Sequence, residues 1–361
     1  MDKKTAIEAL ARAAYEKSSF NGAWLYAEDG EIVSKGALGR ADAENSSPVR
    51  EDSIFEMASV TKMFTATAVM LLAREGKLGL DDDFTGYFPE YPYGGVTIRH
   101  LLTHTSGMPG FSVRRLVGPI LEKEKRIPEN SEIIRLIRET GEGPAYAPGE
   151  AYGYSDVGYM LLAEAVEKVS GMKFEEFMRE NVFVPSGMKD SGIYHTRRDG
   201  RPSDRFTRNM VLEESGAYAP SDVSELSRSY VVGSDGMNGC DYLYTTVFDM
   251  LAWDRALRGE KTLTLEEQRL MYSPTPLAGG GIAGADEEDD GYGFGWRFKN
   301  EPGAGLVVRH TGNMPGLATW FERFVDADRV IVVLNCRTPA DEAAFRSFKT
   351  GLEEIAKGGR P

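Results

Sequence analysis

"EMASVTKMFTATAVMLLAREG" (residues 56–76) decides how the rest of the chain is interpreted. From residue 60 to residue 75 its apolar residues recur with helical spacing, which predicts an amphipathic helix closed by Gly76. Ser59 and Lys62 lie three residues apart at the start of this helix, a spacing that places both on one face. Two interpretations are open: Ser59 is a nucleophile with Lys62 as its proton partner, or Ser59 only caps the helix, as serine often does.

The Ser-x-x-Lys spacing occurs three times in the chain, so the spacing alone does not identify a catalytic pair. Ser170 ends the helical segment "LLAEAVEKVSG" (161–171). Ser186 lies in the turn-rich segment "VPSGMKDSG" (184–192). Only Ser59 precedes a long helical segment, where the first backbone N–H groups of the helix lack partners. A neutral lysine base also needs a pKa far below the usual value of about 10.4, which burial or a neighbouring group must provide.

The composition is that of a globular protein and narrows the choice of partners. The 361 residues are 41% hydrophobic and 27% charged, with a formal net charge of −14, which argues against a nucleic-acid partner. The apolar runs are too short to span a bilayer, so we expect no membrane segment. Four histidines and two cysteines form no metal-ligand motif, so we expect neither a metal nor another cofactor. The oligomeric state is left open.

The N-terminal segment bears on localisation. "MDKKTAIEALARAAYEKSS" (1–19) has two adjacent lysines but no apolar stretch of the kind that a signal peptide needs. As given, the sequence predicts a cytoplasmic protein. An extracytoplasmic protein whose leader had been trimmed would look the same.

Strand patterns lie at the two ends of the sequence, and helical patterns fill its middle. The predicted strands are two about a turn at Asp29-Gly30 within 22–42, and then 292–298, 305–312, 318–326 and 329–336. Outside the middle, the predicted helices are 5–17, 60–75, 245–259 and 341–357. This order predicts an α+β fold, with one antiparallel sheet from both chain ends, flanked by helices, and an inserted, mostly helical lobe.

We expect residues 1–361 to form a single catalytic unit. Its α/β lobe would comprise about 1–78 and 238–361, and its helical lobe about 79–237. The Gly-rich, acidic segment 277–291 is predicted to be a surface loop, and a lid over a site is the alternative.

Three further motifs accompany the Ser59-Lys62 pair. Tyr154-Ser155-Asp156 precedes a helical segment, and His310-Thr311-Gly312 ends a predicted strand. The third is "LLTHTSGMP" (101–109). Together with Ser59 and Lys62, and in the order in which they occur along the chain, these motifs resemble the serine β-lactamase and penicillin-binding-protein superfamily. The resemblance extends from about residue 20 to residue 336. The resemblance is to its class C β-lactamase-like group, which includes family VIII carboxylesterases, D-aminopeptidases and D,D-carboxypeptidases.

The resemblance implies a β-lactamase-like fold and a role for each motif residue. Ser59 would attack a carbonyl and form an acyl-enzyme, with Lys62 as its proton partner. Tyr154 would relay protons between nucleophile, leaving group and water. The backbone N–H groups of Ser59 and Asn313 would form the oxyanion hole. His104, in "HTSG", would belong to a structural turn of the helical lobe.

Two motif positions depart from the family pattern, and both lie in the expected substrate-binding set of Asp156, His310, Thr311 and Gly312. His310 replaces the usual lysine that helps hold a substrate carboxylate, and a histidine is mostly neutral at pH 7. Asp156 replaces the usual asparagine, and a carboxylate cannot donate a hydrogen bond as an amide does. Two alternatives are open for Asp156: it pairs with Lys62, which would raise the lysine pKa, or it holds a substrate amine.

The sequence therefore predicts a serine hydrolase that acts on esters or amides of small molecules. A true β-lactamase or D,D-peptidase is one alternative, which His310 and the N-terminal segment disfavour. A non-catalytic binding or sensor protein on the same scaffold is the other, which the intact Ser59, Lys62 and Tyr154 disfavour.

Overall fold

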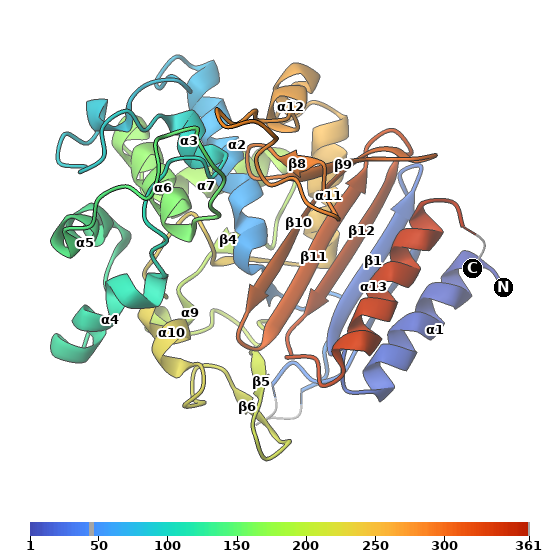
Figure 1. The fold of residues 1–361 in the computed structure, drawn as a ribbon. Helices are drawn as coiled ribbons and strands as arrows, with labels where there is room; N and C mark the ends of the chain where they lie inside the picture. Colours follow the sequence, from blue (N-terminus) through green and yellow to red (C-terminus); the bar gives the residue numbers. More distant parts are fainter. Residues whose placement is uncertain (43–46, 360–361) are drawn as a thin grey trace.

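A seven-stranded antiparallel sheet organises the molecule, and the computed structural model describes residues 1–42 and 47–359 of it (Figure 1). The strands, in spatial order, are β2 (Glu31–Leu38), β1 (Gly22–Glu28), β12 (Arg329–Asn335), β11 (Leu317–Phe324), β10 (Gly305–Met314), β9 (Arg297–Glu301) and β8 (Gly291–Tyr292). Strand β1 pairs with β12 along its whole length, from Gly22 opposite Asn335 to Glu28 opposite Arg329. The predicted sheet built from both chain ends is confirmed.

Helices cover both faces of this sheet. On one face, α1 (Lys3–Glu16) and α13 (Glu342–Ala356) lie side by side (Figure 1). Their apolar residues pack with one side of the strands, where Trp24, Trp320 and Val333 are buried. The other face packs against α2 (Thr61–Arg74) and the helices around it in a second, larger core.

The segment 60–75 forms a helix as predicted, but the helix is not amphipathic. Residues Thr61 to Met70 of α2 are all buried, including Lys62, because the sheet lies on one side of α2 and the inserted helices lie on the other. A helix that is enclosed on all sides needs no polar face. The one charge within its first turns is therefore a buried charge that needs partners.

The remaining elements include strands within the predicted helical lobe. The other helices are α3 (Ile98–Leu102), α4 (Val113–Lys123), α5 (Ile133–Thr140), α6 (Asp156–Ser170), α7 (Phe174–Met178), α8 (Val184–Ser186), α9 (Thr196–Asp199), α10 (Arg228–Gly233), α11 (Val247–Arg258) and α12 (Leu265–Met271). The other strands are β3 (Phe55–Glu56), β4 (Gly192–Ile193), β5 (Met210–Leu212), β6 (Tyr218–Pro220) and β7 (Leu243–Thr245). Strands β3, β7 and β4 form a separate three-stranded sheet. The lobe boundaries stay a prediction.

The predicted strand 292–298 is wrong, because a tight turn divides it. The backbone N–H of Gly293 donates to the carbonyl of Trp296 at 2.8 Å, so β8 ends before the turn and β9 begins after it. Gly295 has a φ of +77°, and a Cβ on it would lie 2.6 Å from the carbonyl oxygen of Lys62. This turn therefore packs directly on the backbone of α2 at the lysine.

Replacing Gly295 with alanine should destabilise the fold by about 1–3 kcal/mol, because the change adds both backbone strain and a clash with α2. Gly303 offers a matched control, since its φ is +82° and no atom lies within 4 Å of the added Cβ. Urea unfolding should show a larger loss for Gly295→Ala than for Gly303→Ala. Equal losses would mean that the approach to Lys62 is not tight.

Within the described residues, no helix is both long and apolar enough to cross a membrane.

Candidate active site

Ser59 lies in a 3₁₀ turn, Ala58–Val60, between β3 and α2. Ala58 has a φ of +46°, which is a strained value for an alanine and is typical of a turn that presents a functional side chain. The helix begins at Thr61, and the Ser59 hydroxyl makes no capping bond. Its Oγ instead lies 3.0 Å from Lys62 Nζ, which donates to it. The helix-cap interpretation of Ser59 is therefore wrong.

Hydrogen bonds from two sheets hold this turn. The backbone N–H of Met57 donates to the carbonyl of Leu243 at 2.8 Å. From the other side, the Thr319 hydroxyl donates to the Met57 carbonyl at 2.8 Å. Strand β10 passes so close that a Cβ on Gly312 would lie 2.0 Å from the Met57 oxygen. The glycine of the His-Thr-Gly motif thus allows β10 to lie against the turn that carries Ser59.

The other two Ser-x-x-Lys pairs are not assembled in this way. The Ser170 hydroxyl accepts from the backbone N–H of Met172, while Lys173 pairs with Glu167. The Ser186 hydroxyl lies 2.7 Å from that of Thr262. In the part of the chain that the structure describes, neither serine is hydrogen-bonded to the lysine of its motif.

Lys62 is fully buried and has three hydrogen-bond partners. Its Nζ donates to Ser59 Oγ at 3.0 Å, to Asp156 Oδ1 at 2.7 Å and to the Cys240 carbonyl at 3.1 Å. Burial alone would lower the pKa of Lys62, but Asp156 and then Tyr154 outweigh burial and raise it well above the usual range. The lysine is thus an ammonium at neutral pH. The lowered pKa that a neutral lysine base needs is therefore not present at rest, and of the two alternatives for Asp156 the pairing with Lys62 is the one observed.

Tyr154 lies just before α6, with its ring centroid 5.0 Å from Lys62 Nζ. Burial raises the pKa of its hydroxyl, Lys62 lowers it and Asp156 raises it, with a result of about 12. Ser59 and Lys62 are also among the side chains that lower this pKa, which agrees with the position of the ring over the Lys62 ammonium. Tyr154 is 40% exposed. Tyr154 is therefore a neutral phenol that lies beside the serine and faces solvent.

His310 is a buried, neutral imidazole. Its Nδ1 lies 2.7 Å from the carbonyl oxygen of Thr311, which can only accept, so Nδ1 carries the proton. Its Nε2 then accepts from the hydroxyl of Tyr292 at 3.1 Å. Burial and then the charge of Lys62 lower the pKa of His310 to about 3. The structure thus places no cation at the position of the usual lysine.

The chain matches a known group of proteins. A sequence profile described as Beta-lactamase matches residues 7–350. This chain belongs to the Beta-lactamase family. It is 33% identical over 337 residues to Penicillin-binding protein 4* of Bacillus subtilis, covering 92% of this chain and 72% of that protein. It is 30% identical over 324 residues to Esterase EstB of Burkholderia gladioli, covering 80% of this chain and 78% of that protein.

A solved structure agrees with this assignment at the level of the fold. The crystal structure of a penicillin-binding protein from Bacillus halodurans superposes with a TM-score of 0.80 at 23% identity, covering 98% of this chain and 100% of that one. The predicted resemblance and the predicted α+β fold of this family are both confirmed.

His104 contributes more to this family site than the sequence indicated. Its ring centroid lies 4.3 Å from that of Tyr154 and 4.7 Å from that of Tyr292. Its Nδ1 accepts from the backbone N–H of Ser155 at 3.1 Å, which fixes the segment that carries Tyr154. His104 lies in a turn, with a φ of +58°, as expected. The "HTSG" motif is also the sequence feature that could have indicated its contact with Tyr154.

The oxyanion-hole and substrate-binding assignments on β10 stay predictions that the geometry permits. Strand β9 pairs with β10 only from Gly305 to Arg309. Beyond Arg309, no strand of the described residues pairs with that edge of β10, where Thr311 is half-buried and Asn313 is exposed. An open strand edge beside the nucleophile can align an extended group of a substrate.

One group of possible metal ligands lies beside the lysine. Asp156, Cys240 and Asp241 each offer an atom within 4.8 Å of the others. Asp156 already pairs with the ammonium of Lys62, and burial followed by Asp241 raises the pKa of the Cys240 thiol well above its usual range. A positive charge in contact and an un-ionised thiol both oppose a metal cation, so these residues fit a proton-transfer site better.

The segment 277–291 lies against the loop that leads to Tyr154. The backbone N–H of Ala278 donates to the carbonyl of Gly149, and that of Tyr292 donates to Ala283. Its acidic part pairs with Arg297, through Asp286 at 3.4 Å and through Asp289. The segment is thus a surface loop tied to the rim of the site, and the lid alternative stays a prediction.

Proposed function

We propose that this protein is a serine hydrolase that cleaves esters or amides of small molecules through an acyl-enzyme on Ser59. The observation that carries the proposal is the ammonium of Lys62, 3.0 Å from Ser59 Oγ and 2.7 Å from Asp156 Oδ1, with Tyr154 beside them. A helix-capping role for Ser59 would not explain why a buried lysine with three hydrogen-bond partners lies beside it. The similarity to an esterase supports the same chemistry.

In the proposed reaction, Ser59 Oγ attacks the carbonyl carbon of the substrate and loses its proton to a base form of Lys62 or Tyr154. At rest neither group is a base, since Lys62 is charged and the pKa of Tyr154 is about 12. One of them must lose a proton first, which predicts a rate that rises with pH. The same group then protonates the leaving alcohol or amine, and a water molecule later hydrolyses the acyl-enzyme.

Neutral substrates fit the electrostatics of this site best. His310 is uncharged, so β10 offers no cation to a substrate carboxylate at this position. The net charge of −14 adds a general repulsion of anions. We therefore infer that short-chain esters are turned over faster than penicillins or cephalosporins.

Replacing His310 with lysine should raise the relative use of carboxylate-bearing substrates by about tenfold, a typical contribution of a charge-assisted contact. The measurement is the ratio of kcat/KM for a cephalosporin to that for a p-nitrophenyl ester, at fixed salt. Ser347→Lys, on the exposed side of α13, adds the same charge far from the site and should leave the ratio unchanged. A wild-type ratio near one would show that another group binds the carboxylate.

Labelling with a fluorophosphonate, followed by mass spectrometry, tests the proposed function itself. We expect a single adduct on the peptide that contains Ser59, and then activity in a panel of short-chain esters, D-amino acid amides and a chromogenic cephalosporin. Absence of any adduct would favour the non-catalytic alternative. Turnover of the cephalosporin alone would favour a true β-lactamase.

A further inference from the structure

A groove of about 650 Å³ lies on the face of the sheet opposite to Ser59, between α13 and strands β9 to β11. Strand residues alternate between the two faces. Val308 packs in the core that contains the Ser59 turn, whereas Val307 and Trp320 pack in the core beneath α1 and α13. Glu322 and Trp320, which line the groove, have their side chains on this second side. Thr311 and Asn313 line the groove as well, so one end of it reaches the β10 residues of the candidate active site, while the part around Glu322 lies on the face away from Ser59.

The floor of the groove contains a buried carboxyl group that lacks a partner. Glu322, on β11, is 3% exposed and lines the groove. Its Oε1 lies 3.9 Å from Nη1 of Arg309, and no hydrogen-bond partner for its Oε2 exists within residues 1–42 and 47–359. Buried polar atoms in folded proteins are nearly always paired, so an orphaned carboxyl oxygen that faces a cavity points to a ligand.

Seven acidic side chains line the groove, against five basic ones. Arg309 is shared among Asp289, whose Oδ1 lies 2.9 Å from its Nε, Glu353, whose Oε1 lies 3.5 Å from its Nη1, and Glu322. Lys349 pairs with Glu353 at 3.7 Å. Burial and then the charge of Glu353 raise the pKa of Glu322 to about 8, as expected where a further positive charge is missing.

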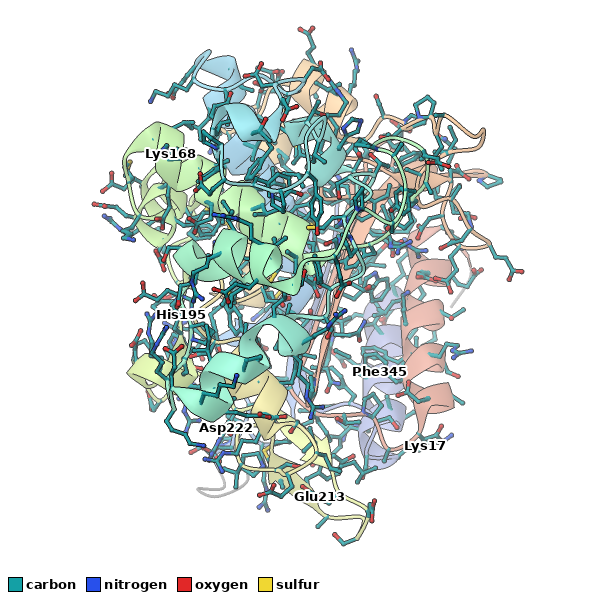
Figure 2. All side chains as sticks on the ribbon, turned by 60° about the vertical axis from the view of Figure 1, so that its left-hand side comes forward. Lys17, Lys168, His195, Glu213, Asp222 and Phe345 are labelled. Carbon is teal, nitrogen blue, oxygen red and sulfur yellow. The ribbon has the colours of Figure 1, made fainter. Side chains whose placement is uncertain are left out.

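The walls of the groove are apolar and aromatic. Val307, Phe324 and Trp320 line one side, and Phe345 lines the other. Phe345 lies in the first turn of α13, where Figure 2 labels it. The Trp320 ring already attracts a cation, since Lys349 Nζ lies 5.3 Å from its centroid. The volume greatly exceeds that of a metal ion, and these walls would solvate an ion poorly.

We propose that this groove binds a small organic cation, with an ammonium group at Glu322 and Glu353 and an aliphatic body along Trp320 and Phe345. The ammonium supplies the donor that Glu322 Oε2 lacks and balances the excess of carboxyl groups. The body covers the half-buried Phe345, while Trp320, Val307 and Phe324 are already buried in the protein. An organic amine thus contacts both the carboxyl groups and the apolar side chains of the groove, whereas a metal ion would contact only the carboxyl groups.

Isothermal titration calorimetry with cadaverine tests the site, with 1-pentanol and magnesium chloride as comparison ligands at the same ionic strength. We expect saturable binding of cadaverine to the wild type and to Ser59→Ala alike, and no saturation by pentanol. Glu322→Gln and Glu353→Gln should each weaken binding by about tenfold or more, because each removes one carboxylate partner of the ammonium. Glu354→Gln, an exposed neighbour on α13, removes the same charge and should bind as the wild type does.

Three results would overturn the proposal. One is the absence of saturation by about 10 mM cadaverine, which would mean that the Kd is too high for a specific binding site. The second is an equal loss in Glu354→Gln and Glu322→Gln, which would mean diffuse surface attraction. The third is magnesium binding that cadaverine does not reproduce. Far-ultraviolet circular dichroism checks that each variant is folded, and Glu353→Gln tests the site independently if Glu322→Gln is not.

Discussion

Ser59→Ala should lower the turnover of p-nitrophenyl esters by at least about 10³-fold and abolish fluorophosphonate labelling. The reason is geometric as well as chemical. Ser59 Oγ is the acceptor that lies 3.0 Å from the buried ammonium of Lys62, and no alanine can attack a carbonyl. The fold should survive the change, because the turn is held by backbone contacts of Met57 rather than by the serine hydroxyl.

Ser170→Ala is the matched control for this experiment. It removes the serine of another Ser-x-x-Lys pair, whose hydroxyl only accepts from the backbone N–H of Met172. We expect this variant to keep both labelling and turnover. Labelling that persists in Ser59→Ala, or an adduct that maps to Ser170 or Ser186, would contradict the assignment of the nucleophile.

The sheet and the motif residues could be predicted from sequence because both depend on local patterns. The alternation of apolar residues within 22–42 and after residue 304 predicts strands, whatever positions those strands take in the folded sheet. The spacing of Ser59 and Lys62 on one helix also brings them together, whatever surrounds them. The same local reasoning fails at 292–298, because the turn there is set by contact with α2 and not by the strand pattern.

The charge state of the site could not be predicted, because it depends on side chains from distant segments. Lys62 meets Asp156 and the carbonyl of Cys240 only after the helices around α2 have packed. The sequence shows a lysine beside a serine, which favours a neutral base, and it does not show which of the many carboxylates will contact the lysine. For the same reason the role of His104 was underestimated, since its contact with Tyr154 joins two motifs some fifty residues apart.

Asp156→Asn should shift the rise of activity with pH to lower pH, whether Lys62 or Tyr154 is the base. Burial has the largest effect on both candidates, lowering the pKa of Lys62 and raising that of Tyr154, and the charge of Asp156 raises both. Asparagine keeps an oxygen that can accept from Lys62 but removes the charge, so both pKa values fall. A base acts only after it has lost its proton, so a lower pKa increases its active fraction at any given pH below that pKa.

The measurement is the pH profile of kcat/KM for a neutral ester, which reports the groups of the free enzyme. On the rising limb, the variant should exceed the wild type by about tenfold for each unit that the limb moves. Asp204→Asn removes the same charge from a side chain that is 88% exposed, and its limb should coincide with that of the wild type. A limb that stays in place in Asp156→Asn would mean that neither Lys62 nor Tyr154 limits the reaction. A limb that moves to higher pH would mean that the carboxylate of Asp156 itself takes up the proton.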